Sequence, residues 1–186
     1  MFHAPAALDD VAEGSVPGLI TLLRADAAAT RVRRGRFGPF VYPDYVATAA
    51  YRLARFVRVR GAVATARAIS VIAHGLTGAE LDPIAVVGPG FVIAHTHGVV
   101  LGQGVRAGRD LYLHGGAVLG STSAGFPTLG DDVTVFAKAS VIGPIHVGDR
   151  AVVGAHALVL DDVPPDSTAR GLPAVSFPRA PRQPDG

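Results

Sequence analysis

The second half of the chain repeats with a period of six residues. Aliphatic or small residues recur at every sixth position in three uninterrupted runs: Leu81, Val87 and Ile93; then Leu101, Ala107, Leu113 and Leu119; then Leu129, Val135, Val141, Val147, Val153 and Val159. The position after many of them is glycine, as at Gly88, Gly102, Gly108, Gly120, Gly130, Gly148 and Gly154. Self-similarity at a fixed period is the signature of a repeat architecture.

This period predicts a mainly β fold, a left-handed parallel β-helix over residues 81–164. Three short strands form one triangular coil of about 18 residues, so the repeats supply somewhat over four coils. The aliphatic residue of each hexad is expected to point inward and to stack on its equivalent one coil away, because each coil buries its apolar face only against its neighbours. The glycines are expected at the corners, where they can adopt positive φ.

Two insertions interrupt the register. Val99 and Val100 precede Leu101, and four extra residues stand between Leu119 and Leu129, within the segment SAGFPT. Insertions in solenoids form loops, often on the functional face.

The first half predicts a short α-helical segment before the β-helix. Helices are expected over residues 17–36, 43–60 and 62–74, after sixteen residues without pattern. The predicted division is therefore an N-terminal segment (1–80), the β-helix (81–164), and a C-terminal extension with a flexible tail (165–186). The helices could lie on a membrane surface as basic amphipathic elements, but packing on one another and on a neighbouring subunit is favoured.

Composition and charge narrow the possible functions. The chain contains no cysteine, which excludes disulfides, thiolate nucleophiles and cysteine-type zinc sites. No segment offers about 20 uninterrupted apolar residues, and the N-terminus does not resemble a secretory signal, so a cytoplasmic protein without membrane partners is expected. The net charge of +2 is weak evidence for nucleic acid. The basic run RVRRGR fits a nucleic-acid patch or a solvated helix end, and the helix end is favoured.

Histidines are the candidate catalytic groups. His95 and His114 should lie on one side of the β-helix in adjacent coils, with strands about 4.8 Å apart. An imidazole is the usual general base for a hydroxyl proton. We therefore predict His95, in the segment AHTHG, as the base, with His97 and His114 sharing or orienting its site. His146 and His156 are expected at the surface. Imidazoles also bind metals, but no carboxylate stands beside these histidines and no metal site is predicted.

Several segments together resemble the serine O-acetyltransferases and related hexapeptide acyltransferases, over about residues 40–175. They are YRLARF, LTGAELDPIAVVGPGFVIAHTHGVVLG, LHGGAVLGST and VPPDSTARGLPA. The resemblance implies that His95 is the general base, that the acceptor oxygen attacks acetyl-CoA directly, and that the chain forms homotrimers. It also implies coenzyme A contacts at Gly120, Ala137, Lys138, Ala155 and Arg170.

Two departures from the family pattern concern the acceptor. Ala94 replaces the aspartate that precedes the family's catalytic histidine, and the short loop SAGFPT, with Phe126, replaces a longer loop carrying an Arg-His pair. These changes favour acetyl transfer to a sugar or natural-product hydroxyl. The alternatives are a true serine O-acetyltransferase, a metal-dependent lyase similar to the γ-class carbonic anhydrases, and an inactive scaffold.

Overall fold

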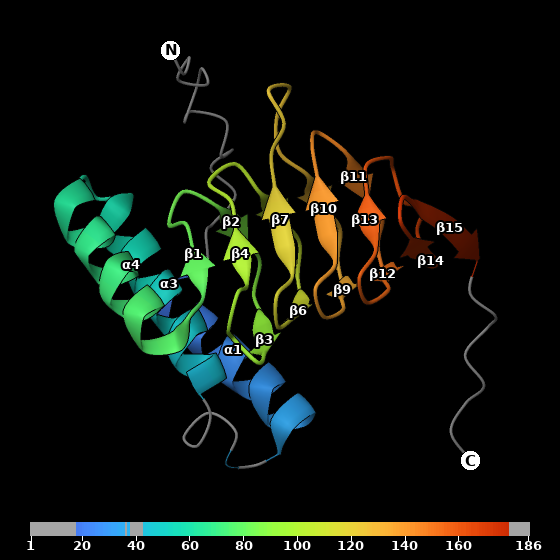
Figure 1. Ribbon diagram of the computed structural model, residues 1–186. Helices are drawn as coiled ribbons and strands as arrows, with labels where there is room; N and C mark the ends of the chain where they lie inside the picture. Colours follow the sequence, from blue (N-terminus) through green and yellow to red (C-terminus); the bar gives the residue numbers. More distant parts are fainter. Residues whose placement is uncertain (1–17, 36, 38–42, 179–186) are drawn as a thin grey trace.

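The computed structural model describes residues 18–35, 37 and 43–178. The predicted patternless start, residues 1–16, lies outside these ranges, as do residues 179–186 of the predicted C-terminal tail. Three helices come first: α1 (Leu19–Arg34), α3 (Pro43–Arg58) and α4 (Val63–Thr77). They gather at one end of an elongated β structure (Figure 1). No helix in the described ranges has the length and apolarity needed to cross a membrane.

The β structure is a prism whose sides are three sheets, in which all strand pairs are parallel except that of β14 with β15. Sheet A has the order β1 (Glu80–Leu81), β4 (Val100–Leu101), β7 (Val118–Gly120), β10 (Ser140–Ile142) and β13 (Leu158–Val159). Sheet B contains β2 (Val86–Val87), β5 (Arg106–Ala107), β8 (Thr128–Leu129) and β11 (His146–Val147). Sheet C contains β3 (Val92–Ala94), β6 (Tyr112–His114), β9 (Thr134–Val135), β12 (Val152–Val153), β14 (Ser167–Gly171) and β15 (Ala174–Pro178).

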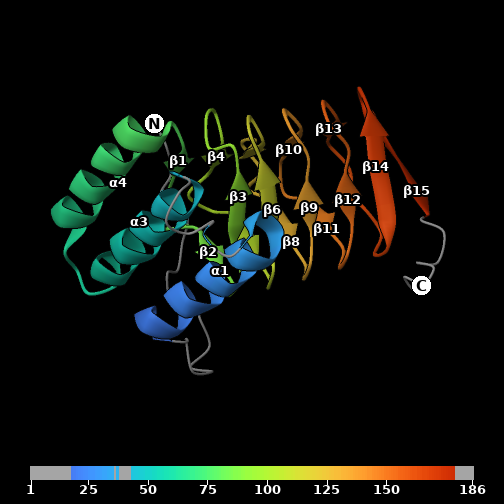
Figure 2. The ribbon, with the colours of Figure 1, turned by 90° about the horizontal axis from the view of Figure 1, so that it is seen from below.

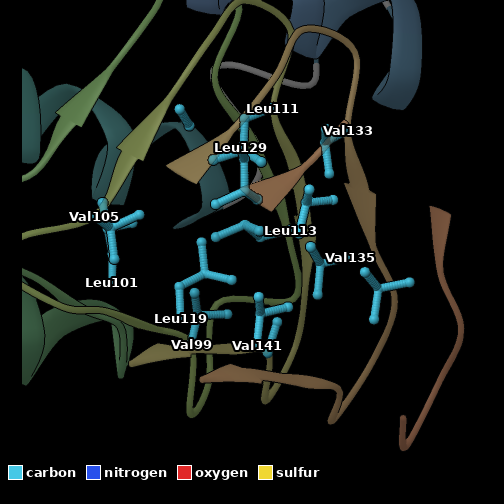
Figure 3. Packing of buried hydrophobic residues seen from close by; sticks show 14 of the residues in the cluster. Val99, Leu101, Val105, Leu111, Leu113, Leu119, Leu129, Val133, Val135 and Val141 are labelled. Carbon is cyan, nitrogen blue, oxygen red and sulfur yellow. The ribbon is translucent and has the colours of Figure 1, made fainter. Parts of the chain in front are cut away.

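The predicted left-handed β-helix of about four coils is confirmed. The repeating aliphatic residues face inward and are buried, and in β6 and β10 the residues on either side of them are partly exposed. In β3 the flanking residues Val92 and Ala94 are buried as well. Ile93, Leu113 and Val135 follow one another in neighbouring coils of sheet C, and each is completely buried. Figure 3 shows this continuous apolar interior. Burial of the stacked residues is the main stabilising term of such a fold.

The expected reason for the repeat glycines was wrong. Gly88 and its equivalents do not adopt positive φ; that conformation occurs two residues later, at positions such as Gly90, Asp110 and Lys138. Glycine is required at Gly88 because a Cβ would lie 2.6 Å from the carbonyl oxygen of Gly108 in the next coil. Close approach of stacked backbones, rather than a left-handed turn, therefore selects glycine at Gly88, Gly108, Gly130 and Gly148.

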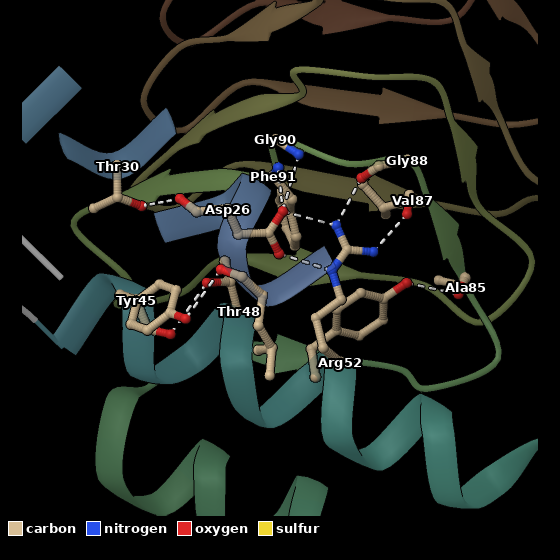
Figure 4. Close-up of polar contacts among 12 residues, drawn as sticks. Asp26, Thr30, Tyr45, Thr48, Arg52, Ala85, Val87, Gly88, Gly90 and Phe91 are labelled. Carbon is tan, nitrogen blue, oxygen red and sulfur yellow. Dashed lines mark hydrogen bonds and ion pairs between the residues drawn. The ribbon is translucent and has the colours of Figure 1, made fainter. Parts of the chain in front are cut away.

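A buried ion pair fastens the helices to the β-helix. Arg52 of α3 donates to the Asp26 carboxylate of α1 at 2.7 and 3.1 Å, and also to the carbonyl oxygens of Val87 and Gly88. The same carboxylate accepts hydrogen bonds from the backbone N–H groups of Gly90 and Phe91. Figure 4 shows the complete network. It places α1 and α3 against the first coil, and Figure 2 shows α1 along the side of the prism.

Sheet C continues beyond residue 164, the predicted end of the β-helix. Strand β14 pairs in parallel with β12 and then turns back into the antiparallel strand β15. The hexad register is lost at Pro164 and Pro165, and for this reason the sequence did not predict strand β14.

Candidate active site

The candidate site lies on one edge of the prism, where sheet C turns into sheet A. We call this the His95 edge; it consists of the turns at residues 95–99, 115–117, 136–139 and 154–157. Backbone hydrogen bonds connect successive turns, from Gly116 to His97, from Lys138 to Gly115, and from His156 to Ala137. The edge is therefore a continuous column of backbone running the length of the β-helix.

His95 lies in the first turn of the His95 edge, directly after β3. Its side chain is exposed, and its backbone has φ = 64°, a left-handed conformation that is uncommon for a residue with a side chain. The backbone N–H of His95 donates to Asp44 Oδ1 at 3.3 Å, while Arg34 donates to Asp44 Oδ2 at 2.9 and 2.6 Å. A buried carboxylate from the first turn of α3 thus supports the strained backbone of the candidate base.

His114 lies beside His95, as the hexad register predicted. The residue paired with it in sheet C is Ala94, which immediately precedes His95. The His114 ring is half-buried between two aromatic rings, with centroid distances of 4.5 Å to Tyr112 and 4.7 Å to Phe136. Burial lowers the pKa of His114, and the electrostatic influence of neighbouring His95, Arg33 and Arg34 lowers it further. The imidazole of His114 is therefore held neutral near pH 7.

His97 is placed differently from His114. Its side chain is exposed and packs against Gly78, the left-handed residue that ends α4. The two histidines of the segment AHTHG therefore reach different surroundings. The structure brings His95, in the turn after β3, close to His114, and it places the ring of His97 against the end of α4.

Four of the five predicted coenzyme A residues lie on or beside the His95 edge. Ala137, Lys138 and Ala155 belong to its turns, and Arg170 lies within β14, next to Gly154. The Arg170 guanidinium lies 4.4 Å from the centre of the Phe177 ring. From the coil of His95 to that of Arg170 there are four steps, or about 19 Å along the prism. Gly120 is separate, because it ends β7 on sheet A, at the far end of that strand.

Phe126 lies on another edge, where sheet A turns into sheet B. Its ring packs on Gly102 and Gly104, where a Cβ would collide with it, and it adds to the apolar core. Within one chain Phe126 therefore does not line the site of His95.

The sequence did not identify four residues that lie close to the two histidines: Arg33, Asp44, Tyr112 and Phe136. Arg33 belongs to the basic run that was assigned to a helix end, and its guanidinium lies 4.2 Å from the centre of the Tyr112 ring. Tyr112 and Phe136 flank inward positions of the repeat, so they had to face outward. The sequence could have indicated that outward row, but not which helix would cover it.

No group of three or more histidine, aspartate or glutamate side chains within the described ranges is placed to hold a metal ion. Arginines and aromatic rings surround His114, and Asp44, the carboxylate beside the His95 backbone, already holds Arg34. An exposed imidazole such as that of His95 is the usual group to remove a proton from an acceptor hydroxyl.

Comparison with known proteins gave consistent matches. The chain is 34% identical over 178 residues to the serine acetyltransferase of Mycobacterium tuberculosis, covering 90% of this chain and 77% of that protein. It is 42% identical over 138 residues to the serine acetyltransferase of Helicobacter pylori, covering 72% and 81%. A solved serine acetyltransferase in complex with CoA superposes with a TM-score of 0.81 at 27% identity, covering 86% of this chain and 69% of the other. No family model matches.

Proposed function

The chain belongs to the serine acetyltransferase family, and on that premise we propose that its acceptor is the side-chain hydroxyl of serine. It is an acetyl-CoA-dependent O-acetyltransferase. The observation that carries the proposal is the position of His95, an exposed imidazole at the head of a continuous backbone edge. The relatives named as serine acetyltransferases support serine over the sugar or natural-product hydroxyl that Ala94 and Phe126 had favoured.

The proposed chemistry is a direct transfer. The His95 imidazole removes the proton from the serine hydroxyl as the oxygen attacks the thioester carbonyl carbon. The resulting oxyanion collapses, the C–S bond breaks, and the imidazolium returns its proton to the departing thiolate of CoA. Backbone N–H groups are the usual donors that stabilise such an oxyanion.

Coenzyme A is proposed to lie along the His95 edge. The edge is long enough for an extended ligand, with the thioester at His95 and the charged end toward Lys138 or Arg170. A homotrimer is part of the same proposal, because flat-sided prisms pack around a threefold axis.

Replacing Lys138 by alanine tests the cofactor placement. Lys138 is exposed and already in a left-handed turn, so the change removes a cation without disturbing the core. We expect KM for acetyl-CoA to rise by about three- to tenfold, as for loss of one charged contact. Steady-state kinetics at saturating serine measures this, and Lys138→Arg should retain most of the affinity. An unchanged KM would place the phosphates elsewhere.

A second acceptor class remains a candidate because of Ala94. At Ala94 this chain has a methyl group where the serine acetyltransferase pattern has an aspartate carboxylate. The change removes one possible partner for the ammonium group of an amino-acid acceptor. A hydroxyl compound without an amino group would not need that partner.

The acceptor is tested by measuring CoA thiol release from acetyl-CoA with purified protein. Serine is expected to give turnover about tenfold or more above glucose and above a hydroxylated aromatic compound, because the relatives of this chain are named as serine acetyltransferases. Mass spectrometry should identify O-acetylserine. Faster release with an uncharged hydroxyl compound would reverse the assignment in favour of the second class.

A further inference from the structure

A cavity of about 510 Å³ lies between α4 and the first coil, at the end of the molecule where the helices meet the prism (Figure 1). Its walls come from the end of α3, from α4, and from β1 with the turn that follows it. None of the described residues that line it belongs to the His95 edge. Small-molecule sites are commonly clefts of about 300–1,000 Å³. The cavity therefore has the size of a ligand site and lies outside the candidate active site.

Two arginines line the helical wall of this cavity without a protein partner. Arg58 ends α3, and Arg67 lies one turn into α4. Among the described residues neither guanidinium forms an ion pair or a hydrogen bond. Arg55 of α3, by contrast, donates to carbonyl oxygens of the first coil. Because a guanidinium binds a carboxylate through two parallel hydrogen bonds, the helical wall can hold an anionic group.

The coil wall of the cavity carries the opposite charge. Glu80 of β1 and Asp82 directly after it line the cavity, and in the described part of the chain neither carboxylate forms an ion pair. Asp82 Oδ1 accepts the backbone N–H of Ile84 at 2.8 Å, which fixes the direction of the carboxylate. Exposed apolar side chains, Val63 and Val71 of α4, line the same cavity. Cations on one wall, acids on the other and apolar surface beside them match a zwitterion with an aliphatic body.

A shielded hydroxyl lies in the same cavity. Ser70 Oγ, on α4, is hidden from solvent and has no hydrogen-bond partner among the described residues. A serine inside a helix can satisfy its hydroxyl on the carbonyl four residues earlier, but Ser70 does not. Shielded polar atoms without a partner are uncommon, so this hydroxyl is an independent sign of a ligand contact.

The end of α4 connects the cavity to the turn that carries His95. His74 lines the cavity, and its Nδ1 lies 3.3 Å from the carbonyl oxygen of Ala79. The carbonyl oxygen of Thr77 accepts a hydrogen bond from the Thr96 hydroxyl, and that of Gly78 accepts one from the backbone N–H of Gly98. A shift of α4 would therefore act on both sides of His97, within the first turn of the His95 edge.

We propose that this cavity is a second binding site, for an aliphatic amino acid or its dipeptide, and that its occupant modulates acetyl transfer from outside the active site. The ligand carboxylate binds the two arginines of the helical wall, the ammonium group binds the two acids of the coil wall, and the aliphatic body covers the valines of α4. Binding here does not depend on which acceptor is acetylated, so the inference goes beyond the proposed function.

Calorimetric titration of the full chain with L-leucine and with L-leucyl-L-leucine tests the site directly. At least one of these zwitterions is expected to bind at a single site per chain. The N-acetylated form of that ligand lacks the ammonium charge and its amide lacks the carboxylate, so each should bind about tenfold more weakly. Absence of saturable binding by both zwitterions overturns the site. Equal affinity for the zwitterion and its N-acetylated form overturns the role of the acidic wall.

Variants assign binding to the cavity. Arg67→Gln should raise Kd by about tenfold. Arg24→Gln removes the same charge from an exposed position on α1 that does not line the cavity, and it should match the wild type. Ser70→Ala should raise Kd by about threefold without lowering the thermal midpoint, because it removes a hydroxyl that has no partner in the free protein. An unchanged Kd in Arg67→Gln places the ligand elsewhere and overturns the site.

Acetyl transfer to serine measures the effect on activity. Saturating ligand should change kcat by about fivefold, and the change should be absent in Arg67→Gln and retained in Arg24→Gln. A rise in KM for serine alone that persists in Arg67→Gln would place the ligand in the acceptor site and overturn the inference. Binding without any kinetic change overturns the regulatory role. If serine is not acetylated at all, the proposed acceptor is wrong, and the titrations still decide whether the second site exists.

Discussion

Replacing His95 by alanine is expected to lower kcat for acetyl transfer by about 10²- to 10⁴-fold, the usual contribution of a general base. No other described group has the same position at the head of the His95 edge. His114 is held neutral and could accept a proton, but its Nε2 is shielded from solvent. The measurement is single-turnover acetyl transfer to serine with acetyl-CoA in excess.

Two controls distinguish lost chemistry from lost structure. His95→Asn removes the base but suits the left-handed backbone better than alanine, because asparagine tolerates positive φ. Both variants should lose activity equally while retaining the oligomeric state and thermal midpoint of the wild type. His146→Ala, at an exposed position on sheet B, should leave activity unchanged. Near-normal turnover by both His95 variants would remove His95 from its role.

The fold was largely predictable because the repeat is a local property of the sequence. A residue such as Leu113 has the same inward environment as its equivalents six positions away, so periodicity alone reports its burial. The same register predicted that His95 and His114 would be neighbours, and the pairing of Ala94 with His114 confirms it. The handedness and the number of coils followed from the same pattern.

The surroundings of the site were not predictable, since they depend on contacts between distant segments. Asp44 reaches the His95 backbone across 51 positions of sequence. The contact of Arg33 with Tyr112 depends on how α1 crosses sheet C, which is set by the buried pair of Asp26 and Arg52. Nothing in the periodicity of either helix specifies that crossing. The sequence therefore identified the candidate base but not the charges beside it.

Removing one member of the buried pair is expected to have the largest effect on stability. Asp26→Ala would leave the Arg52 guanidinium buried without its counter-charge, and the N–H groups of Gly90 and Phe91 without an acceptor. Breaking a buried pair in this way costs about 3–5 kcal/mol. For a chain of this size the corresponding fall in thermal midpoint is roughly 6–20 °C.

The double variant Asp26→Ala/Arg52→Met separates the two origins of that loss. If the uncompensated charge dominates, removing Arg52 as well should recover part of the stability, because no buried charge remains. Denaturant midpoints of the two single variants and the double variant give the coupling. Arg150→Met, which breaks an exposed pair with Asp166, is the matched control and should change the midpoint little. If the double variant is as unstable as the sum of the singles, the two residues contribute independently, through their separate hydrogen bonds to the backbone of the first coil.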